Sequence, residues 1–417
     1  MSFRFIFLFL CLQVSISNKI LSNLSLLFED SNDCGTWQKK YAQLHTDILQ
    51  KNIPPKYLIS IAGRCGVADN LSGLITQFLL ALLTNRAFLR FSFDELIRLE
   101  DVYTSPYINW SSPTLPNRLY GCMTAPYGPQ KDEWCRRLQR NPPKWPLMSL
   151  KTYPMHLTEY DHEMFLNSNL KSYPIGKRGV PVLLVAGHKG RVWKTFTNTH
   201  HKTQLHEMGL HQENAFSCFY NYLFRLRSHI CVESCQYISQ QLLTLSASRV
   251  VIIGIQIRVG DTVFENDKNT PFSSGSAHFQ CADDIAHSLA PHVSVKYYLV
   301  SDSLQLKREA RKHYGERIIT DISTPVVHTD CNNKADNCSI SLVRRALSHS
   351  VSDLHLFSLA HIHIVTVNSG FGVLGAMMRN TKYHLLYSID IVKKEKRHCR
   401  IGNEDDLNVL LMQWTGI

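Results

Sequence analysis

Short apolar runs alternate with amphipathic stretches in two regions of the chain, a pattern typical of parallel α/β units. In the first region, the apolar runs 57–62 and 87–91 flank a stretch with helical periodicity. The apolar positions of that stretch are Leu71, Leu74, Ile75, Phe78, Leu79 and Leu82. This order predicts a strand, a glycine-containing loop, a helix and a second strand, with Asp69 or Asn70 as the N-cap of the helix.

The second region begins with the stretch Arg249–Asp261, in which the run Val250–Ile255 contains five β-branched residues and no proline. Such a run predicts a strand that is buried on both faces. Regular alternation then continues, and we expect strands over 295–300, 361–367 and 383–389 and helices over 304–313, 350–359 and 373–379. Between the two regions we expect a strand over 181–187 and a helix over 216–230.

Polar side chains directly follow three of these predicted strands, at Arg258, Asp302 and Ser369. Because the carboxyl ends of parallel strands share one edge, where open α/β sheets bind ligands, we expect the three to converge. An arginine at that edge can grip phosphate oxygens with its planar fork. The alternative is a core strand followed by a surface arginine and a Gly-Asp turn.

The loop Gly63–Asn70, which precedes the first predicted helix, is a second candidate anion site. The free N–H groups at a helix N-terminus can hold a phosphate. The alternative is an ordinary βα turn that uses its glycines only for backbone geometry.

The length of 417 residues suits two domains, and contents of 44% hydrophobic and 19% charged residues describe a globular protein. We place the domain boundary at 240/241. Prolines and tryptophans crowd residues 100–178, which we interpret as an irregular insertion in the first domain. The fold class is therefore α/β, with a βαβ unit in the first half and doubly wound character in the second.

The formal net charge of +11 favours an anionic ligand or surface without selecting among nucleotide, nucleic acid and acidic lipid. The densest basic run, 393–398, is interrupted by Glu395 and has no interleaved aromatic residues. We interpret that run as a solvated face and expect no nucleic-acid partner.

Residues 1–17 indicate a secretory signal peptide. An apolar run, 5–12, follows Arg4, and Ser15 and Ser17 have the spacing that signal peptidase requires. The run is far shorter than the ~20 apolar residues of a membrane span, although a type II anchor is the alternative. No other segment has the composition of a span, so we expect the mature chain in the lumen of the endoplasmic reticulum or Golgi, or outside the cell.

Twelve cysteines fit such an oxidising compartment. Three close pairs are candidates for local disulfides: Cys122/Cys135, Cys231/Cys235 and Cys331/Cys338. Glycosylation sequons begin at Asn23, Asn109 and Asn337, and a fourth, at Asn70, is expected to be buried.

We expect no metal site in this chain. The pair Cys231 and Cys235 lacks a second ligand pair at the distance typical of zinc sites. Four histidines have no acidic or cysteine partner at fixed spacing: His200, His201, His206 and His211. The acidic run 404–406 is more typical of a helix cap or surface charge than of a cation site.

Three blocks of sequence, 57–91, 249–303 and 350–378, carry a resemblance to a known family. Their motifs are Gly63–Arg86, Gln256-Ile-Arg-Val-Gly-Asp261, Asp353-Leu-His-Leu-Phe-Ser358 and Ser369-Gly-Phe-Gly372. The chain resembles the superfamily of α1,2-, α1,6- and protein O-fucosyltransferases, especially its plant and algal xyloglucan-type members. The resemblance implies a GT-B architecture of two Rossmann-like domains facing a cleft. It also implies inverting transfer of fucose from GDP-fucose to a glycan hydroxyl, with no cofactor and no metal.

The resemblance also implies roles for individual residues. Arg258 would hold the β-phosphate and stabilise the departing GDP. The nucleotide-binding residues would be Gly66, Asp69 and Asn70 along the diphosphate, Asp302 near the ribose, Asp353 at the guanine edge, and Ser369, Gly370 and Phe371 closing on the phosphates.

The chain departs from the family at Gln256, where a histidine is usual. Glutamine can still form a hydrogen bond to the nucleotide. The base that deprotonates the acceptor is expected to be Glu265, with Asp261 second, and the alternative for Glu265 is an exposed loop acid.

Two further functions stay open at this point. The first is a carbohydrate- or nucleotide-binding pseudoenzyme of the same fold, which Gln256 and the uncertain base favour. The second is a lumenal sulfotransferase, which should carry a phosphate loop with a lysine, whereas Gly63–Asn70 contains only Arg64 as a cation. Release of GDP from GDP-fucose in the presence of glycan acceptors distinguishes these functions.

Overall fold

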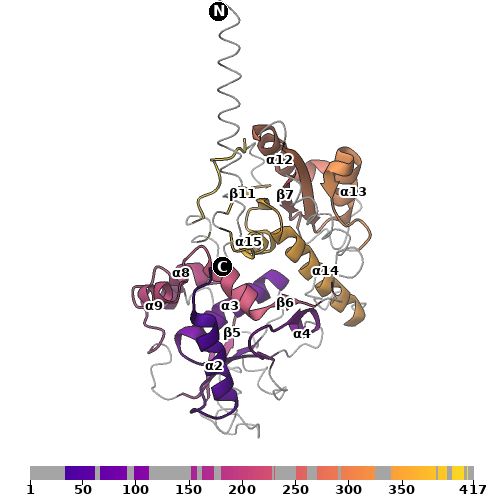
Figure 1. Cartoon of the computed structure of the whole chain (residues 1–417). Helices are drawn as coiled ribbons and strands as arrows, with labels where there is room; N and C mark the ends of the chain where they lie inside the picture. The colour runs from indigo at the N-terminus through magenta and orange to yellow at the C-terminus, as the bar shows by residue number, and fades with distance from the viewer. Residues whose placement is uncertain are drawn as a thin grey trace, which may run out of the picture. The chain divides into compact units, whose positions relative to one another are not determined.

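The computed structural model describes residues 33–61, 66–91, 98–111, 152–156, 162–172, 180–227, 230, 250–260, 270–289, 293–324, 340–381, 384–391, 397–407 and 411. The chain divides into two compact units. The first unit comprises residues 33–231, 327–352 and 407–417, and the second comprises 1–32, 232–326 and 353–406. Each contains a parallel sheet with helices, as the sequence predicts (Figure 1). The boundary at 240/241 stays a prediction.

The first unit is organised around a four-stranded parallel sheet with the order β2-β1-β5-β4. Its strands are β1 (Tyr57–Ile61), β2 (Ala87–Phe91), β4 (Thr152–His156) and β5 (Val182–Ala186). β1, β2 and β5 confirm the predicted strands, and all their residues are buried. β4 contradicts the expectation that 100–178 is irregular throughout. Pro154 is tolerated there because β4 is an edge strand, where a missing N–H can face away from the sheet.

The helix between β1 and β2, α3 (Val67–Leu83), begins earlier than the sequence predicts. Gly66 is its N-cap, so the expected cap at Asp69 or Asn70 is wrong, and both lie in the first turn. Gly73 lets the helix approach the loop after β5, because a Cβ there would lie 2.6 Å from the carbonyl oxygen of Gly187. The sequon asparagine Asn70 is 6% exposed, as expected.

Aromatic side chains pack α3 against α2 (Trp37–Leu49) and α10 (Ala215–Leu223). Five rings contact one another at centroid distances of 4.7–6.2 Å: Trp37, Tyr41, Phe78, Phe219 and Tyr222. Large rings dominate the burial energetics of such a core. A disulfide between Cys34 and Cys218, 184 residues apart, joins the segment before α2 to α10.

The predicted helix over 216–230 is wrong beyond Leu223, where α10 ends. Phe224 adopts an extended conformation, and its ring lies 5.0 Å from that of Tyr103 and 5.8 Å from that of Trp110. The chain then enters β6 (Arg225–Leu226), which pairs in antiparallel fashion with β3 (Tyr103–Thr104). The shorter helices of this unit are α4 (Leu99–Val102), α7 (His162–Asn167), α8 (Val192–Thr195) and α9 (Lys202–Glu207).

The second unit holds a five-stranded parallel sheet with the order β11-β10-β7-β8-β9. Its strands are β7 (Val250–Ile257), β8 (Ser294–Ser301), β9 (Ile318–Ile319), β10 (Ile362–Thr366) and β11 (Leu386–Ile389). All except β9 correspond to predicted strands. β9 was missed because a strand of two residues is too short to show a periodic pattern. β7 is central and buried along its whole length, as its sequence predicts.

Helices cover both faces of this sheet, namely α12 (Ser276–Ser288), α13 (Leu304–Tyr314), α14 (Ile340–Ser358) and α15 (Gly370–Met377), with the 3₁₀ turns η5 (Phe272–Gly275) and η6 (Gly315–Arg317). Ile255 and Ile257 share a core with α12 and α13 on one face. On the other, Gly254 leaves room for α14, because a Cβ there would lie 2.9 Å from the Phe357 ring. α14 and α15 begin earlier than the predicted 350 and 373.

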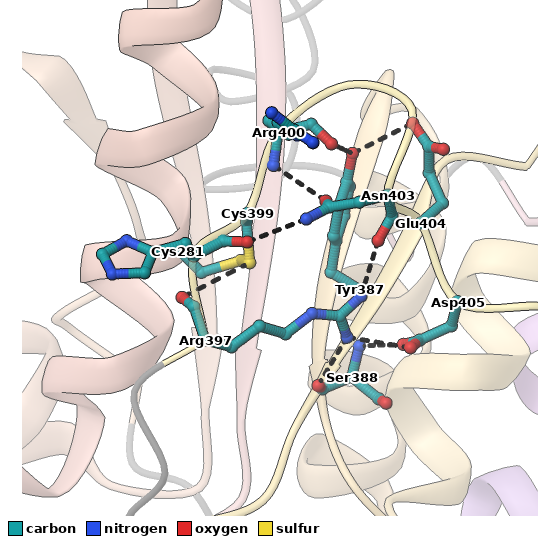
Figure 2. A network of polar contacts seen from close by, with 10 residues as sticks. Cys281, Tyr387, Ser388, Arg397, Cys399, Arg400, Asn403, Glu404 and Asp405 are labelled. Carbon is teal, nitrogen blue, oxygen red and sulfur yellow. Dashed lines mark hydrogen bonds and ion pairs between the residues drawn. A yellow bond between two sulfur atoms is a disulfide. The ribbon is translucent and has the colours of Figure 1, made fainter.

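The segment 397–405 folds along β11 at the end of the sheet (Figure 2). Asp405 accepts a hydrogen bond from the backbone N–H of Ser388 and pairs with Arg397, whose Nη1 lies 2.8 Å from Oδ1. The Tyr387 hydroxyl donates to Glu404 at 3.0 Å. Glu404 and Asp405 therefore stabilise the edge of the sheet through these contacts.

A disulfide between Cys281 and Cys399, 118 residues apart, fixes this segment to α12 (Figure 2). Both disulfides described here join distant parts of one unit. The three predicted local pairs lie outside the described residues, as do residues 1–17. Within the described ranges, no helix combines the length and the apolar character needed to cross a membrane.

Candidate functional site

The candidate site of the second unit lies at the carboxyl edge of its sheet, where Arg258 follows β7. The guanidinium Nη1 of Arg258 lies 2.9 Å from Oδ2 of Asp302, which follows β8. The Arg258 side chain keeps 31% exposure, whereas that of Asp302 is only 6% exposed. Neighbouring strand ends thus bring together an arginine and an aspartate that the sequence places 44 positions apart.

Asp302 also holds the turn after β7. Its Oδ1 accepts from the N–H of Val259 at 2.8 Å, and its Oδ2 accepts from the N–H of Gly260 at 3.1 Å. Gly260 has a φ of +132°, a conformation that side chains rarely adopt. Burial raises the pKa of the Asp302 carboxyl, and the backbone donors and Arg258 oppose that rise. With these three donors on its oxygens, the carboxylate positions Arg258.

Thr366, the last residue of β10, holds the same turn from the other side. Its Oγ1 accepts from the backbone N–H of Arg258 at 2.9 Å and donates to the carbonyl of Gln256 at 3.3 Å. His278 of α12 completes the group, with Nε2 3.0 Å from that hydroxyl. The direction of this hydrogen bond depends on the imidazole tautomer, because the single hydroxyl proton of Thr366 has two possible acceptors, the Gln256 carbonyl and Nε2.

His278 is fully buried, and burial lowers its pKa to about 3. The ring is therefore neutral at physiological pH and supports the turn through its hydrogen bond to Thr366. Its other nitrogen, Nδ1, has no hydrogen-bond partner within the part of the chain that the structure describes.

The turn after β10 presents the N-terminus of α15 at the same edge. Asn368 has a φ of +62°, which asparagine tolerates better than most residues, and Ser369 is the N-cap. The first helical backbone bond runs from Val373 to Ser369 at 3.3 Å, so the N–H groups of Gly370 and Phe371 come before it. Such N–H groups, together with the positive end of the helix dipole, can hold an anion.

Gln256 lies inside the unit, with 3% exposure. Its Oε1 accepts from the N–H of Thr366 at 3.3 Å. A Cβ at Gly372 would lie 2.4 Å from that oxygen, so the glycine makes room for the amide beneath α15. Gln256 therefore supports the turn, and its predicted contact with a nucleotide stays a prediction.

Asp353 lies on α14 beside β8, away from the strand ends. The Tyr298 hydroxyl donates to its Oδ1 at 3.3 Å, and Nζ of the buried Lys307 lies 3.6 Å from its Oδ2. Tyr298 stands three residues before the end of β8, about 10 Å along the strand. The predicted contact between Asp353 and guanine is untested, and Lys307 is the charge partner of this carboxylate.

The first unit has a comparable edge, where α3 begins after β1. Gly66 is the N-cap and Asp69 lies in the first turn, while the Asn70 side chain donates to the Gly66 carbonyl at 3.4 Å. The segment after β5 contains two buried cations, Arg191 before α8 and Lys194 within it, each 1% exposed. Burial lowers the pKa of Lys194, and the charge of Arg191 lowers it further.

The chain shares its architecture with solved structures. A mutant of Arabidopsis thaliana FUT1 in complex with GDP aligns with a TM-score of 0.52 and 17% identity, over 84% of this chain and 78% of that one. The α-1,6-fucosyltransferase NodZ co-crystallised with GDP aligns with a TM-score of 0.43 and 14% identity, over 77% of this chain and 91% of that one. The fold is fucosyltransferase-like. No protein-family model and no curated protein matches the sequence.

The fucosyltransferase-like fold confirms the predicted GT-B class of two parallel α/β domains. The candidate bases Asp261 and Glu265 lie outside the described residues. Within the described part of the chain, no three histidine, cysteine, aspartate or glutamate side chains gather in a way that could hold a metal ion. The cleft between the domains stays a prediction.

Three residues that support the predicted site residues escaped the sequence analysis: Thr366, His278 and Lys307. Thr366 could have been found, since it is a polar residue at the end of a predicted strand, like Arg258 and Asp302. His278 carried no local signal, because its partner lies 88 positions away.

Proposed function

We propose that the chain is a glycosyltransferase that moves fucose from GDP-fucose to a hydroxyl group of a glycan. The observation that carries this proposal is the guanidinium of Arg258, held past the end of β7 on the sheet edge that also bears the N-terminus of α15. The fold shared with GDP-bound FUT1 supports a guanine nucleotide as the carrier of the sugar.

The charge of the leaving group explains why an arginine belongs at this position. As the bond between the sugar and the β-phosphate breaks, negative charge grows on the phosphate oxygens, and a fixed cation stabilises that charge. Asp302 and Thr366 hold the turn and the guanidinium before the reaction, so little reorganisation is needed. The N–H groups of Gly370 and Phe371 would add fixed dipoles.

In the proposed reaction, the acceptor oxygen attacks the anomeric carbon of fucose from the face opposite GDP. The bond from that carbon to the phosphate oxygen breaks, and its electron pair leaves with GDP, so the configuration inverts. The acceptor proton passes to a carboxylate, for which Glu265 and then Asp261 are the candidates. We also propose that no metal ion takes part, since Arg258 and the helix N-terminus supply positive charge.

Nucleotide recognition would use residues in both units. We propose that Asp353 accepts from the guanine edge and that Gly66, Asp69 and Asn70 line the diphosphate. Asp302 was expected near the ribose, but its oxygens already accept from Arg258 and two backbone N–H groups. We therefore propose Asp302 chiefly as a positioning residue for Arg258.

We propose that the protein works in the lumen of the secretory pathway or outside the cell. The two disulfides, Cys34–Cys218 and Cys281–Cys399, support an oxidising compartment. The signal peptide over 1–17 remains a prediction from the sequence.

The decisive experiment measures GDP release from GDP-fucose by the full chain with a panel of β-galactoside acceptors. Arg258→Ala should lower kcat by roughly 10²–10³ because one charge stabiliser is lost. Arg258→Lys, which keeps the charge but loses the fork, should fall between that variant and wild type. A chelator should leave the rate unchanged.

Two outcomes would overturn the proposal. Near-normal transfer by Arg258→Ala would remove the assigned role of the guanidinium. Tight GDP binding by the wild type without GDP release over the whole acceptor panel would instead support a pseudoenzyme that binds the nucleotide without turnover.

A further inference from the structure

The first unit contains a pocket of about 590 Å³ that none of the proposed chemistry uses. Its wall includes three arginines, two acids and a serine: Arg98, Arg227, Arg344, Glu100, Asp101 and Ser348. They come from the segment around α4, from the chain after β6 and from the first half of α14, all within one compact unit.

The balance of charge in this pocket is positive. Glu100 is already neutralised, because both of its carboxylate oxygens accept from Nη1 of the buried Arg90, at 3.1 and 3.0 Å. Asp101 is shared, lying 3.8 Å from Nε of Arg98 and 3.4 Å from Nε of Arg344. Three guanidinium groups therefore face a single remaining carboxylate.

The orientation of these guanidinium groups suits an oxyanion. Arg98 and Arg344 approach Asp101 through Nε, and Arg227 donates through Nε to the Glu100 carbonyl at 2.8 Å. Among the described residues, none of the three has a partner on its terminal nitrogens. Those nitrogens form the fork that binds carboxylate or sulfate in bidentate fashion. Arg98 and Arg344 are about half exposed, so a ligand can reach them.

A second pocket, of about 420 Å³, adjoins the first and shares Glu100 and Arg227 with it. Tyr107 lines this second pocket and is 57% exposed, but another ring holds it in place. Its ring stacks on that of Tyr222 at 5.0 Å and an interplanar angle of 3°. An exposed and immobilised ring offers its negative face to the weakly positive C–H groups of a sugar.

Polar groups for hydroxyl recognition line the same second pocket. Thr104 is half-buried at its wall, and its hydroxyl donates to the Arg225 carbonyl at 3.2 Å, so its oxygen can still accept from a sugar hydroxyl. The hydroxyl of Ser105 is inaccessible to solvent and has no hydrogen-bond partner among the residues described. Because solvent does not reach the Ser105 hydroxyl, it offers no hydrogen bond to a ligand, and recognition of sugar hydroxyls rests on Thr104.

We propose that these two adjoining pockets bind an acidic saccharide, with a neutral sugar ring on Tyr107 and a carboxylate or sulfate group on the three arginines. The proposal concerns binding in the first unit and does not depend on the transferase function. Only one further step rests on that function, namely that acidic glycans are the acceptor class to test first.

The test uses calorimetric titration of the full chain with three ligands that share one core: lactose, sialyllactose, which carries a carboxylate, and sulfolactose, which carries a sulfate ester. The acidic ligands should bind at least about tenfold more tightly than lactose, and the advantage should shrink with salt. Whichever acid binds more tightly identifies the source of the anionic group.

Variants separate the two halves of the proposed site. Arg98→Met and Arg344→Met should each weaken the acidic ligands about tenfold and leave lactose unchanged, while Tyr107→Ala should weaken all three ligands. The exposed Arg311 on α13 provides the matched control, because Arg311→Met removes one positive charge outside the pocket. Unchanged thermal midpoints and GDP affinity would show that each variant is folded.

Equal affinity for lactose and its acidic derivatives would overturn the proposal. So would displacement of the acidic ligands by inorganic sulfate at equal concentration, since the sugar would then contribute nothing. If the acidic ligands bind but no GDP is released from GDP-fucose, the result contradicts the proposed transferase function and supports the proposed saccharide site.

Discussion

Arg90 in β2 and Arg258 just after β7 can be compared directly. Each places a guanidinium group beside a parallel strand, and each pairs with a carboxylate. The Arg90 side chain is completely buried, and its Nη1 donates to both oxygens of Glu100. The Arg258 side chain pairs with Asp302 at a similar distance, 2.9 Å, but keeps 31% exposure. Pairing with a carboxylate therefore does not distinguish an arginine that only supports the fold from one that is proposed to act on a substrate.

Exposure does make that distinction. Burial lowers the pKa of Arg90, and the charge of Glu100 opposes that effect, so the two side chains depend on one another for charge balance. Asp302, in contrast, also accepts from two backbone N–H groups and does not rely on Arg258 alone. Arg90 is committed to the fold, whereas Arg258 can still meet a ligand.

The largest effect should come from removing Arg90. Arg90→Met leaves Glu100 without its charge partner, and breaking a buried ion pair costs about 3–5 kcal/mol of unfolding free energy. Urea unfolding followed by tryptophan fluorescence measures this loss, because the described tryptophans, Trp37, Trp110 and Trp193, all lie in the first unit.

The double variant Arg90→Met with Glu100→Gln is the matched control. It removes both charges, so most of the lost stability should return. If Arg90→Met alone costs less than about 1 kcal/mol, then Arg90 is not structural and burial fails as the criterion.

The comparison also shows which parts of the fold a sequence can predict. β1, β2, β5 and β7 were predicted because both faces of each are buried, which produces runs that are apolar at nearly every position. The first half of α14 was missed although Val343, Leu347 and Val351 repeat at helical spacing, since the polar residues between them dilute the pattern. β4 was missed because a proline lies within it.

The sequence predicted the position of candidate site residues only where they follow the ends of strands. Arg258 and Asp302 could be placed together because parallel strands share a carboxyl edge. Their relation could not be predicted, since the sequence does not say whether Asp302 faces a ribose or holds the arginine. His278 and Lys307 reach the site from helices, and only the packed fold brings them to Thr366 and Asp353.

An effect of intermediate size on the unfolding free energy is expected from the titration of His278, which supports the turn that carries Arg258. His278 has a pKa of about 3 in the folded state, below the ~6.5 of an unfolded chain. A lowered folded pKa gives stability that is present above pH 6.5 and is lost as the pH falls towards 3. Between pH 7 and pH 5 this histidine should therefore cost about 2 kcal/mol of unfolding free energy.

Hydrogen exchange of the β7 peptide at pH 7 and pH 5, corrected for the intrinsic exchange rate, measures that loss in the second unit. His278→Gln should show a shallower decline because it does not titrate, whereas His313→Gln, at an exposed position on α13, should decline like wild type. Identical declines for His278→Gln and wild type would mean that His278 is not held neutral behind the turn.

The smallest effect on stability should come from removing Arg258 itself. Arg258→Ala deletes one partly exposed donor to Asp302, and the backbone N–H groups of Val259 and Gly260 remain on that carboxylate. The unfolding free energy should therefore fall by only about 1 kcal/mol, measured by the same exchange of the β7 peptide. A loss as large as that of Arg90→Met would make Arg258 a second structural arginine, and any fall in transfer activity would then report unfolding. A small loss of stability together with a large loss of transfer would assign the guanidinium to the reaction and not to the fold, because a purely structural arginine cannot separate the two.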